Sequence, residues 1–263
     1  MRGRASDRLK RLWWGLLLSF VVLLVCTELL PWGHRLDMWM SHALYNQERH
    51  QFYFSPNNGW VERVVHVGFR NLLLLIPLYS LIQLVFGWIL WRRHGLNTFQ
   101  RSVWQRWARA LVAVAALEVL VFCLKRWSNQ ACPWSLTDFG GAWPYTDLLA
   151  LKPWGAAQMA CWPAGHATGG FSLLIFCFMG GWPPNVWDAR VRSGSVVTPC
   201  YLRPRAFLIY GVLLGSVLGV FRVAQGAHFL THQMWAMWWV VWANAVLAQL
   251  GLYGQSDVFV SME

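Results

Sequence analysis

The sequence predicts an all-α fold: a six-span transmembrane helical bundle in which polar residues gather at the outer membrane face. Three observations lead to this prediction. Hydrophobic residues make up 57% of the 263 residues and charged residues only 13%, a balance too apolar for an ordinary soluble domain. Six apolar runs approach the length that crosses a bilayer. Twenty Trp residues suit a protein with side chains at the membrane interfaces.

The predicted spans follow one another without room for a second domain. The first follows a basic start and is interpreted as an uncleaved helix, because its apolar run is too long for a signal peptide and no small-residue cleavage site follows. The gaps between spans, at most about 40 residues, are below the size that usually folds alone. We therefore expect one membrane domain, 1–263, with spans at 13–31, 72–91, 107–124, 165–181, 206–221 and 234–252.

The basic residues predict the orientation of these spans. Lys and Arg number 22 against 11 acidic residues, and most lie before the first span, between the second and third, and between the fourth and fifth. Cytoplasmic loops carry such an excess, so we expect a multi-pass protein of a bacterial inner membrane with both termini cytoplasmic. The segments 32–70, 125–164 and 222–233 then face the periplasm, where we expect them to pack as a lid. This rule already explains the net charge of +11, so no nucleic-acid partner is expected.

Two polar segments stand at the outer ends of the third and fourth spans. The first, 125–133, begins with Lys125 and ends with Cys132 and a proline. The second, 161–166, ends with Gly165 and His166. Its proline and glycine predict a tight turn into a helix whose first N–H groups can bind an anion. A histidine there suits proton transfer near neutral pH, although an interfacial histidine without a chemical role is the common alternative.

A third polar segment, 222–232, joins the fifth and sixth spans. His228 and His232 are four residues apart and would share one helix face, while Arg222 offers a planar set of donors for phosphate oxygens. His232 could hold one ring nitrogen of His228 and leave the other free to attack. Two alternatives stay open: interfacial histidines without a role, or a zinc site of His166, His228 and His232.

In order and spacing, the three segments resemble the signature of the type 2 phosphatidic acid phosphatase (PAP2) superfamily: KxxxxxxRP, PSGH and SRxxxxxHxxxD. The resemblance covers about 105–250. It implies that His228 attacks phosphorus to form a phosphohistidine and that His166 protonates the leaving oxygen. It also implies that Lys125, Arg222 and the backbone N–H of Gly165 bind the phosphoryl oxygens, without a metal or any other cofactor.

Four positions depart from the family pattern. Cys132 stands where the family has arginine, Ala164 and Phe221 each replace a serine, and His232 replaces the aspartate that orients the nucleophile. An imidazole stabilises a developing imidazolium less than a carboxylate does. The chain is therefore either a divergent enzyme with compensating groups or a weakened one. Outer-loop residues that could compensate are Arg126, Asp138, Asp147 and Lys152, and His66 and Arg70 could line the site as well.

Cys132 and Cys161 are both expected on the outer side, where an oxidising periplasm permits a disulfide. The bond would close the loop between the first and second polar segments. In the chain-entropy model such a closure stabilises the fold by about 3 kcal/mol.

The leading hypothesis is an integral membrane lipid phosphatase that hydrolyses a phosphate or pyrophosphate monoester of a lipid at the periplasmic leaflet. Phosphatidate, phosphatidylglycerol phosphate, undecaprenyl pyrophosphate and the phosphates of lipid A all stay open as substrates. The expected partners are the lipid phosphate and membrane lipids, and the sequence predicts no oligomeric state. The alternatives are a non-catalytic lipid-binding or transport protein on the same scaffold, and a three-histidine, metal-dependent membrane hydrolase.

Overall fold

The computed structural model is mostly helical and describes residues 2–54, 59, 62–150, 159–183, 185–187 and 204–253. The α-helices are α1 (Arg2–Leu24), α2 (Pro31–Ala43), α4 (Phe69–His94), α5 (Thr98–Ser128), α6 (Gly165–Phe171), α7 (Leu174–Phe178), α8 (Pro204–Ala224) and α9 (Leu230–Gln249). Shorter elements are the π-helical turns η1 (Val25–Leu29) and η2 (Glu62–Gly68), the 3₁₀ turns η3 (Pro133–Ser135) and η4 (Thr137–Phe139), and an antiparallel hairpin of β1 (Tyr45–Asn46) and β2 (Gln51–Phe52).

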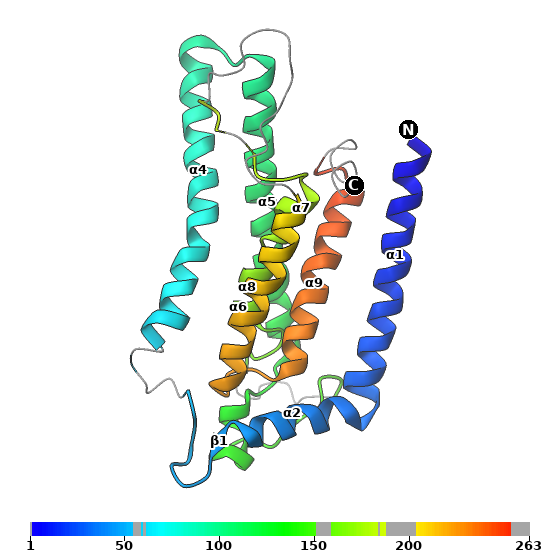
Figure 1. The fold of residues 1–263 in the computed structure, drawn as a ribbon, viewed down its shortest axis with the longest axis vertical. Helices are drawn as coiled ribbons and strands as arrows, with labels where there is room; N and C mark the ends of the chain where they lie inside the picture. The colour runs from blue at the N-terminus through cyan, green and yellow to red at the C-terminus, as the bar shows by residue number, and fades with distance from the viewer. Residues whose placement is uncertain are drawn as a thin grey trace.

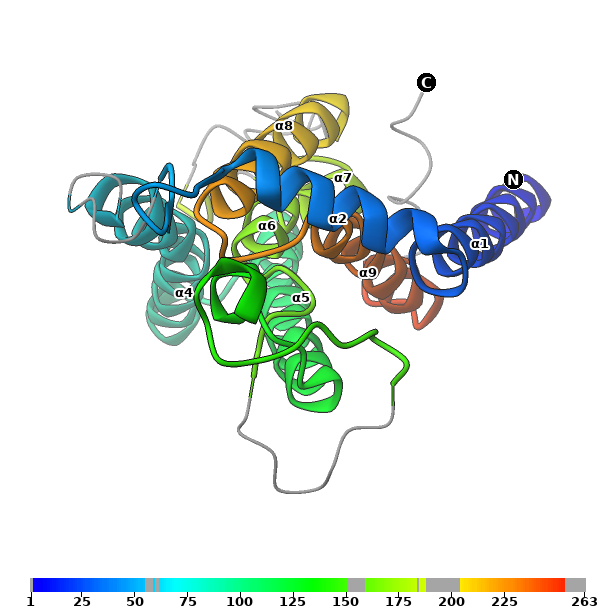
Figure 2. The same ribbon diagram turned by 90° about the horizontal axis from the view of Figure 1, so that it is seen from below.

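The long helices α1, α4, α5, α8 and α9 run along a common direction, and α2 lies across one end of the bundle (Figure 1). We call this the α2 end. Seen from there, α2 passes over α6, α8 and α9 (Figure 2). The start of α1 and the end of α9 lie at the opposite end. The two helix ends therefore lie at the same end of the bundle, while the membrane topology stays a prediction.

Four helical stretches of the described chain are long and apolar enough to cross a membrane: Lys10–Leu29, Asn71–His94, Thr98–Ser135 and Pro204–Ala224. They coincide with four of the six predicted spans. The sixth predicted span corresponds to α9, which is a helix but is not one of these four. Its polar side chains and its several indoles, such as Trp235, lower its hydropathy below that of an ordinary span. A bundle of six spans therefore stays a prediction.

The fourth predicted span is not one continuous helix. Residues 165–181 form α6 and α7, a shorter apolar stretch that is interrupted between Phe171 and Leu174. At the break, the Ser172 hydroxyl donates to the Gly169 carbonyl (2.6 Å) and the N–H of Ile175 donates to the Ser172 carbonyl (3.0 Å). Such three-residue bonds tighten the backbone, and the low helix propensity of consecutive glycines favours a break here.

Glycines let α6 and α7 approach α8 closely. A Cβ atom added to Gly170 would lie 2.5 Å from the Cα of Gly215, and one added to Gly211 would lie 3.2 Å from the Leu174 side chain. Small residues at helix contacts let backbones approach within membranes, where apolar burial gives little driving force. The close contact fixes α6, which begins with Gly165 and His166, against α8, which carries Arg222 in its last turn.

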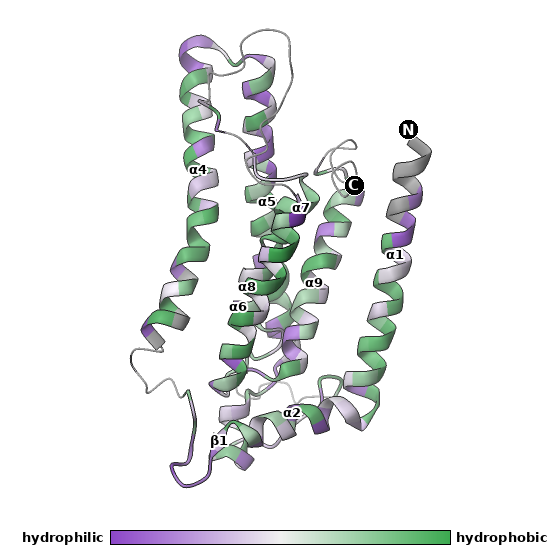
Figure 3. Ribbon diagram, viewed as in Figure 1, coloured by the Kyte–Doolittle hydropathy of each residue, from purple (hydrophilic) through white to green (hydrophobic). Residues whose placement is uncertain are grey.

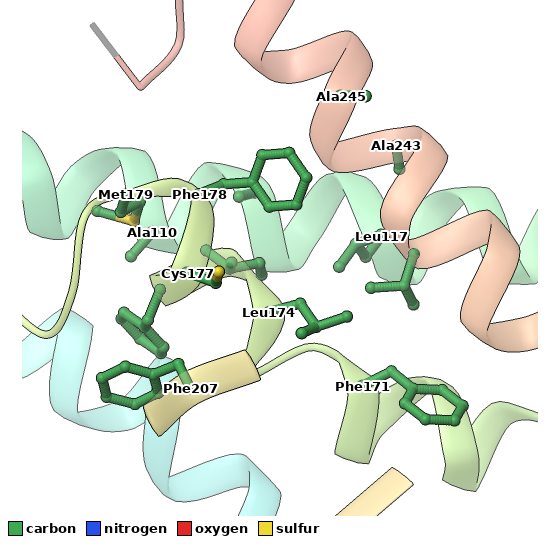
Figure 4. Close-up of a cluster of buried hydrophobic side chains, with 14 of the residues drawn as sticks. Ala110, Leu117, Phe171, Leu174, Cys177, Phe178, Met179, Phe207, Ala243 and Ala245 are labelled. Atoms are coloured by element: carbon green, nitrogen blue, oxygen red, sulfur yellow. The ribbon is translucent and has the colours of Figure 1, made fainter. Parts of the chain in front are cut away.

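The apolar core lies between α5, α7, α8 and α9. The close-up in Figure 4 shows side chains from these helices around α7. Phe207 of α8 packs against Phe176 with ring centroids 5.2 Å apart. Trp107 of α5 is fully buried and meets Trp182 edge-on at 5.1 Å. This packed centre holds the helices whose ends carry the polar segments.

The long helices are rich in apolar residues, as the hydropathy colouring shows (Figure 3). Exposed large side chains on α1, α4 and α8 include Leu18, Leu74 and Leu213. In a soluble protein such surfaces would aggregate, whereas lipid tails solvate them without cost. The chain is therefore a membrane protein.

The described parts of the predicted lid do pack over the α2 end. The hairpin residues Tyr45 and Phe52, the loop residue Phe139 and Phe229 before α9 form a second apolar cluster. Phe52 also lies over Gly226, which has φ of +70° and where an added Cβ would lie 2.3 Å from the Phe52 ring. Only glycine fits this turn, because it tolerates the left-handed backbone and leaves room for the ring.

Candidate functional site

The first and second polar segments are joined side by side beyond the end of α5. The Ser128 hydroxyl donates to the Trp162 carbonyl (2.9 Å), and the N–H of Cys161 donates to the Gln130 carbonyl (3.1 Å). Asn129, which ends α5 in the left-handed conformation, accepts from the N–H of Met159 (2.6 Å). These bonds hold the turn into α6 beside the last turn of α5, where Lys125 lies.

The third polar segment is bonded to both of the others. The N–H of Trp134 donates to the Gly226 carbonyl (2.9 Å), and the N–H of Ala164 donates to the His232 carbonyl (3.4 Å). All three segments, more than 100 positions apart at their extremes, therefore meet at the α2 end of the bundle. The sequence predicted this convergence only on the condition that the bundle was compact.

His228 lies at the centre of this meeting point and is 5% exposed. Burial lowers the pKa of His228 well below its ordinary value, and the positive charges of Lys125, His232, Arg222 and His166 lower it further. The charges of residues from all three polar segments therefore act on His228. The low pKa keeps the imidazole neutral, which is the form that can attack an electrophile.

Arg222 is held in place by two residues that the sequence did not single out. Its Nη1 donates to Oε1 of the buried Gln225 (2.5 Å), and its guanidinium carbon lies 5.6 Å from the ring centroid of Trp134. The signal for Gln225 was its position three residues after Arg222, which places both on one helix face. Nothing local points to Trp134, which directly follows the first segment.

Lys125 and Gly165 lie against each other. The Lys125 ammonium donates to the Ala160 carbonyl (2.6 Å), and a Cβ atom added to Gly165 would lie 3.3 Å from Cε of Lys125. The absence of a side chain at Gly165 therefore leaves room for the lysine. His166 follows on the first turn of α6, and Ala164, where the family has serine, is the N-cap and makes no side-chain capping bond.

The structure joins Cys132 and Cys161 in a disulfide. The buried Sγ of Cys161 also lies 3.5 Å from Nδ1 of His228. We expected His232 to hold a ring nitrogen of His228, and its ring lies at 6.0 Å between centroids. The Cys161 sulfur thus lies next to Nδ1 of His228, and the orienting role of His232 stays a prediction.

The proposed compensating residues are exposed or lie outside the described part of the chain. Arg126, Asp138 and Asp147 are exposed, and Arg126 is directed toward the Phe122 ring at 6.0 Å. Lys152 and the side chains of His66 and Arg70 lie outside the part of the chain that the structure describes. Whether any of these residues compensates for the departures from the signature stays a prediction.

A carboxylate that sequence reasoning missed does reach the third segment. Asp37 of α2, 3% exposed, accepts from the backbone N–H of Thr231 (3.0 Å) and from its hydroxyl (2.5 Å). It therefore caps the first turn of α9, beside His232. Burial raises the pKa of Asp37 to about 7. In the sequence, Asp37 could be noticed as the one acidic residue of a Trp-rich helix, but its partner Thr231 is distant along the chain.

The three-histidine zinc site is not present in the geometry. Among the described residues, the histidine, cysteine and acidic donor atoms close enough to share a metal ion are those of Cys132, Cys161 and His228, all within 4.8 Å of one another. His166 and His232 are described, and they are not part of this group. The ring nitrogens of His166, His228 and His232 are therefore not placed to share one metal ion.

Residues 106–251 match the family model described as the PAP2 superfamily. The match covers more than half of the chain and includes all three polar segments. No curated protein matches the chain, and no solved structure matches it.

Proposed function

Because the chain belongs to the PAP2 superfamily, whose members are phosphatases, we propose that it is a membrane phosphatase that removes a phosphate or pyrophosphate group from a lipid through a phosphohistidine on His228. One observation carries the proposal: the three signature segments meet at the buried His228, on which the charges of Lys125, His166 and Arg222 act. This is a neutral nucleophile beside cations that can bind a phosphoryl group.

His228 attacks phosphorus through Nε2. Its Nδ1 faces the sulfur of Cys161, an atom that can accept a weak hydrogen bond from an Nδ1 proton. With the proton on Nδ1, the Nε2 lone pair is available. Attack forms the N–P bond and breaks the bond from phosphorus to the lipid oxygen, and water then releases phosphate from the histidine.

Lys125 and Arg222 bind the equatorial oxygens of the transferring group. Phosphoryl transfer spreads negative charge over these oxygens, and fixed donors in a buried site stabilise that charge more than water does. Gln225 and Trp134 hold the Arg222 guanidinium in a defined plane, as bidentate recognition of phosphate requires. The backbone N–H of Gly165 adds a further donor.

His166 protonates the leaving oxygen of the lipid. It lies on the first turn of α6 and is one of the residues whose charge acts on His228. Proton transfer from a positioned histidine contributes about 10²–10⁴-fold to such a step. After the lipid alcohol leaves, the neutral His166 can accept a proton from the attacking water.

The position of the site supports a lipid substrate. The site is at the end of an apolar bundle, next to helix α2, where the headgroup of a membrane lipid would lie beside the exposed apolar surfaces of α1, α4 and α8. The distribution of basic residues predicts that this end faces the periplasm. A headgroup phosphate in the outer leaflet is therefore the substrate class that we propose.

The test is phosphate release from a panel of lipid phosphates and diphosphates by the detergent-purified chain, with the His228→Ala variant in parallel. We expect wild type to release phosphate and to trap an acid-labile, base-stable phosphoryl group, and His228→Ala to do neither. His94→Ala, an exposed histidine at the far end of α4, is the matched control and should match wild type. Equal rates for wild type and His228→Ala would exclude the mechanism, and wild type that binds these lipids without phosphohistidine would support the non-catalytic alternative.

A further inference from the structure

The three donor atoms next to the nucleophile have a chemistry that phosphoryl transfer does not use. Sγ of Cys132, Sγ of Cys161 and a ring nitrogen of His228 lie within 4.8 Å of one another, and Nδ1 of His228 lies 3.5 Å from Sγ of Cys161. Cys161 is fully buried and Cys132 is half-buried. One donor comes from each polar segment, so the group exists only in the folded chain.

Two thiolates and an imidazole are a donor set that Zn²⁺ prefers. In a tetrahedral site with Zn–S of about 2.3 Å and Zn–N of about 2.0–2.1 Å, a sulfur and a nitrogen ligand lie about 3.6 Å apart. Cys161 Sγ and His228 Nδ1 already lie 3.5 Å apart. Only the Cys132 sulfur has to move away from its partner to complete three of the four ligand positions.

The oxidation state decides whether this set can bind an ion. Metal ligation requires the thiolate, and the structure joins the two sulfurs in a disulfide. A dithiol reductant supplies two electrons and two protons, so that the S–S bond breaks, each cysteine gains a hydrogen and the dithiol becomes a cyclic disulfide. Zn²⁺ then displaces both thiol protons to solvent and accepts the Nδ1 lone pair.

The charges of the site favour this donor set over histidines alone. Lys125 and Arg222 act on His228 as positive charges, and a zinc ion held only by neutral imidazoles would add two more. Two thiolates cancel the charge of the ion, so the complex adds no net charge beside these cations.

Zinc at Nδ1 would also remove the nucleophile. A neutral imidazole that coordinates metal through Nδ1 carries its proton on Nε2, and then neither ring nitrogen has a free lone pair. In the disulfide form the proton is on Nδ1 and Nε2 can attack. The two oxidation states therefore select opposite tautomers of His228.

We propose that reduction of the Cys132–Cys161 disulfide creates a Zn²⁺ site of Cys132, Cys161 and His228 that switches the nucleophile off. The zinc site itself is independent of the function proposed above, whereas its inhibitory effect rests on that function. The disulfide thus keeps the site metal-free and His228 in its reactive tautomer.

The first experiment measures zinc directly, in the full-length chain purified in detergent. The protein is reduced with a dithiol, the dithiol is removed because it binds zinc itself, and Zn²⁺ is added before desalting. We expect one zinc per reduced chain and none in the disulfide form. Co²⁺ as a probe should give thiolate-to-cobalt absorption only after reduction.

Variants identify the ligands. Cys132→Ser, Cys161→Ser and His228→Ala should each weaken zinc binding by more than the roughly 100-fold cost of losing a group that only supports a ligand. Cys123→Ala, at an exposed free cysteine of α5, and His232→Ala should bind zinc as wild type does. Where a variant does not fold, alkylation of the cysteines in the reduced wild-type chain tests the same ligands, and it should abolish zinc binding.

The site is overturned if the reduced chain takes up no zinc, if the disulfide form takes up as much, or if His232→Ala loses zinc while the cysteine variants keep it. The activity arm compares the two oxidation states with and without zinc. Only the reduced enzyme should lose phosphate release as zinc binds, and a chelator should restore it. Full activity of the zinc-loaded reduced enzyme overturns the switch. A wild type without any phosphatase activity contradicts the proposed function, while zinc uptake still decides the site.

Discussion

The N-terminal part of the chain and the region that matches the family are built on different principles. In the apolar stretch of α1 only 6% of the residues are buried within the protein, whereas 39% are buried in that of α8. Buried polar side chains are concentrated in the family region, where they include Arg222, Gln225 and His228. A helix that lipid can solvate needs no protein partner, while buried polar groups must find partners inside the protein. Polar burial is therefore the better marker of the functional part.

The N-terminal part nevertheless supports the site through a few polar contacts to α9. The indole N–H of Trp235 donates to Thr27 and Glu28 (both 3.1 Å), and Asp37 caps the first turn of α9 through Thr231. Thr27, Glu28 and Asp37 precede the family match, which begins at residue 106. The proposed reacting groups all lie within the family region, whereas part of the framework that positions them lies outside it.

The largest effect should come from a buried cation of the family region. Arg222→Ala removes a donor that we propose binds the phosphoryl group, and we expect kcat to fall by about 100- to 1,000-fold. Arg101→Ala, at an exposed arginine near the start of α5, is the matched control and should keep the wild-type rate. An Arg222→Ala variant that loses no more activity than Arg101→Ala would remove Arg222 from the proposed phosphate site.

Much of the helical framework could be predicted from the sequence, because a span is a local property. An apolar run of spanning length forms a helix whatever its neighbours are, and the four long stretches agree with the prediction. The break in α6–α7 depends on the contact of Gly170 with Gly215 and on the bonds of Ser172. Apolar composition does not encode these tertiary features, so one continuous helix was the wrong expectation there.

The same distinction separates the predicted site residues from the missed ones. Lys125, Arg222 and His228 could be identified because each lies at a fixed spacing within a short segment. The contact between Thr231 and Asp37 joins residues 194 positions apart, and Trp134 meets Arg222 only because two loops pack together. No periodicity or spacing rule connects such pairs, so three-dimensional structure was needed to find them.

The second prediction compares the change in unfolding free energy that a glycine-to-alanine substitution causes in each of the two regions. Gly170→Ala would place a Cβ atom 2.5 Å from Cα of Gly215 and force α6 and α8 apart, which should cost about 3 kcal/mol of unfolding free energy. Gly15→Ala on α1 has no atom within 4 Å of the new Cβ and should be neutral or stabilise by up to about 1 kcal/mol. Unfolding of the detergent-solubilised variants measures both. Equal losses would mean that α1 is packed as tightly as the family region.

The smallest effect tests the contribution of the N-terminal part through pH. Burial raises the pKa of Asp37 to about 7 from an unfolded value of 3.8, so between these values the folded chain holds a proton that the unfolded chain has released. Stability from this group is therefore present below about pH 4 and is lost progressively as the pH rises to about 7. From about pH 5.5 to about pH 8 the loss should reach about 2 kcal/mol.

Asp37→Asn should flatten this slope, because the amide accepts from the Thr231 N–H but does not titrate. Glu28 and Tyr145 also interact with this carboxyl, and Asp147 acts on Tyr145, so the informative quantity is the difference between variant and wild type across the pH range. Asp7→Asn, at an exposed residue of α1, should keep the wild-type slope. If Asp37→Asn and wild type lose stability in parallel as the pH rises, Asp37 is not the buried titrating group.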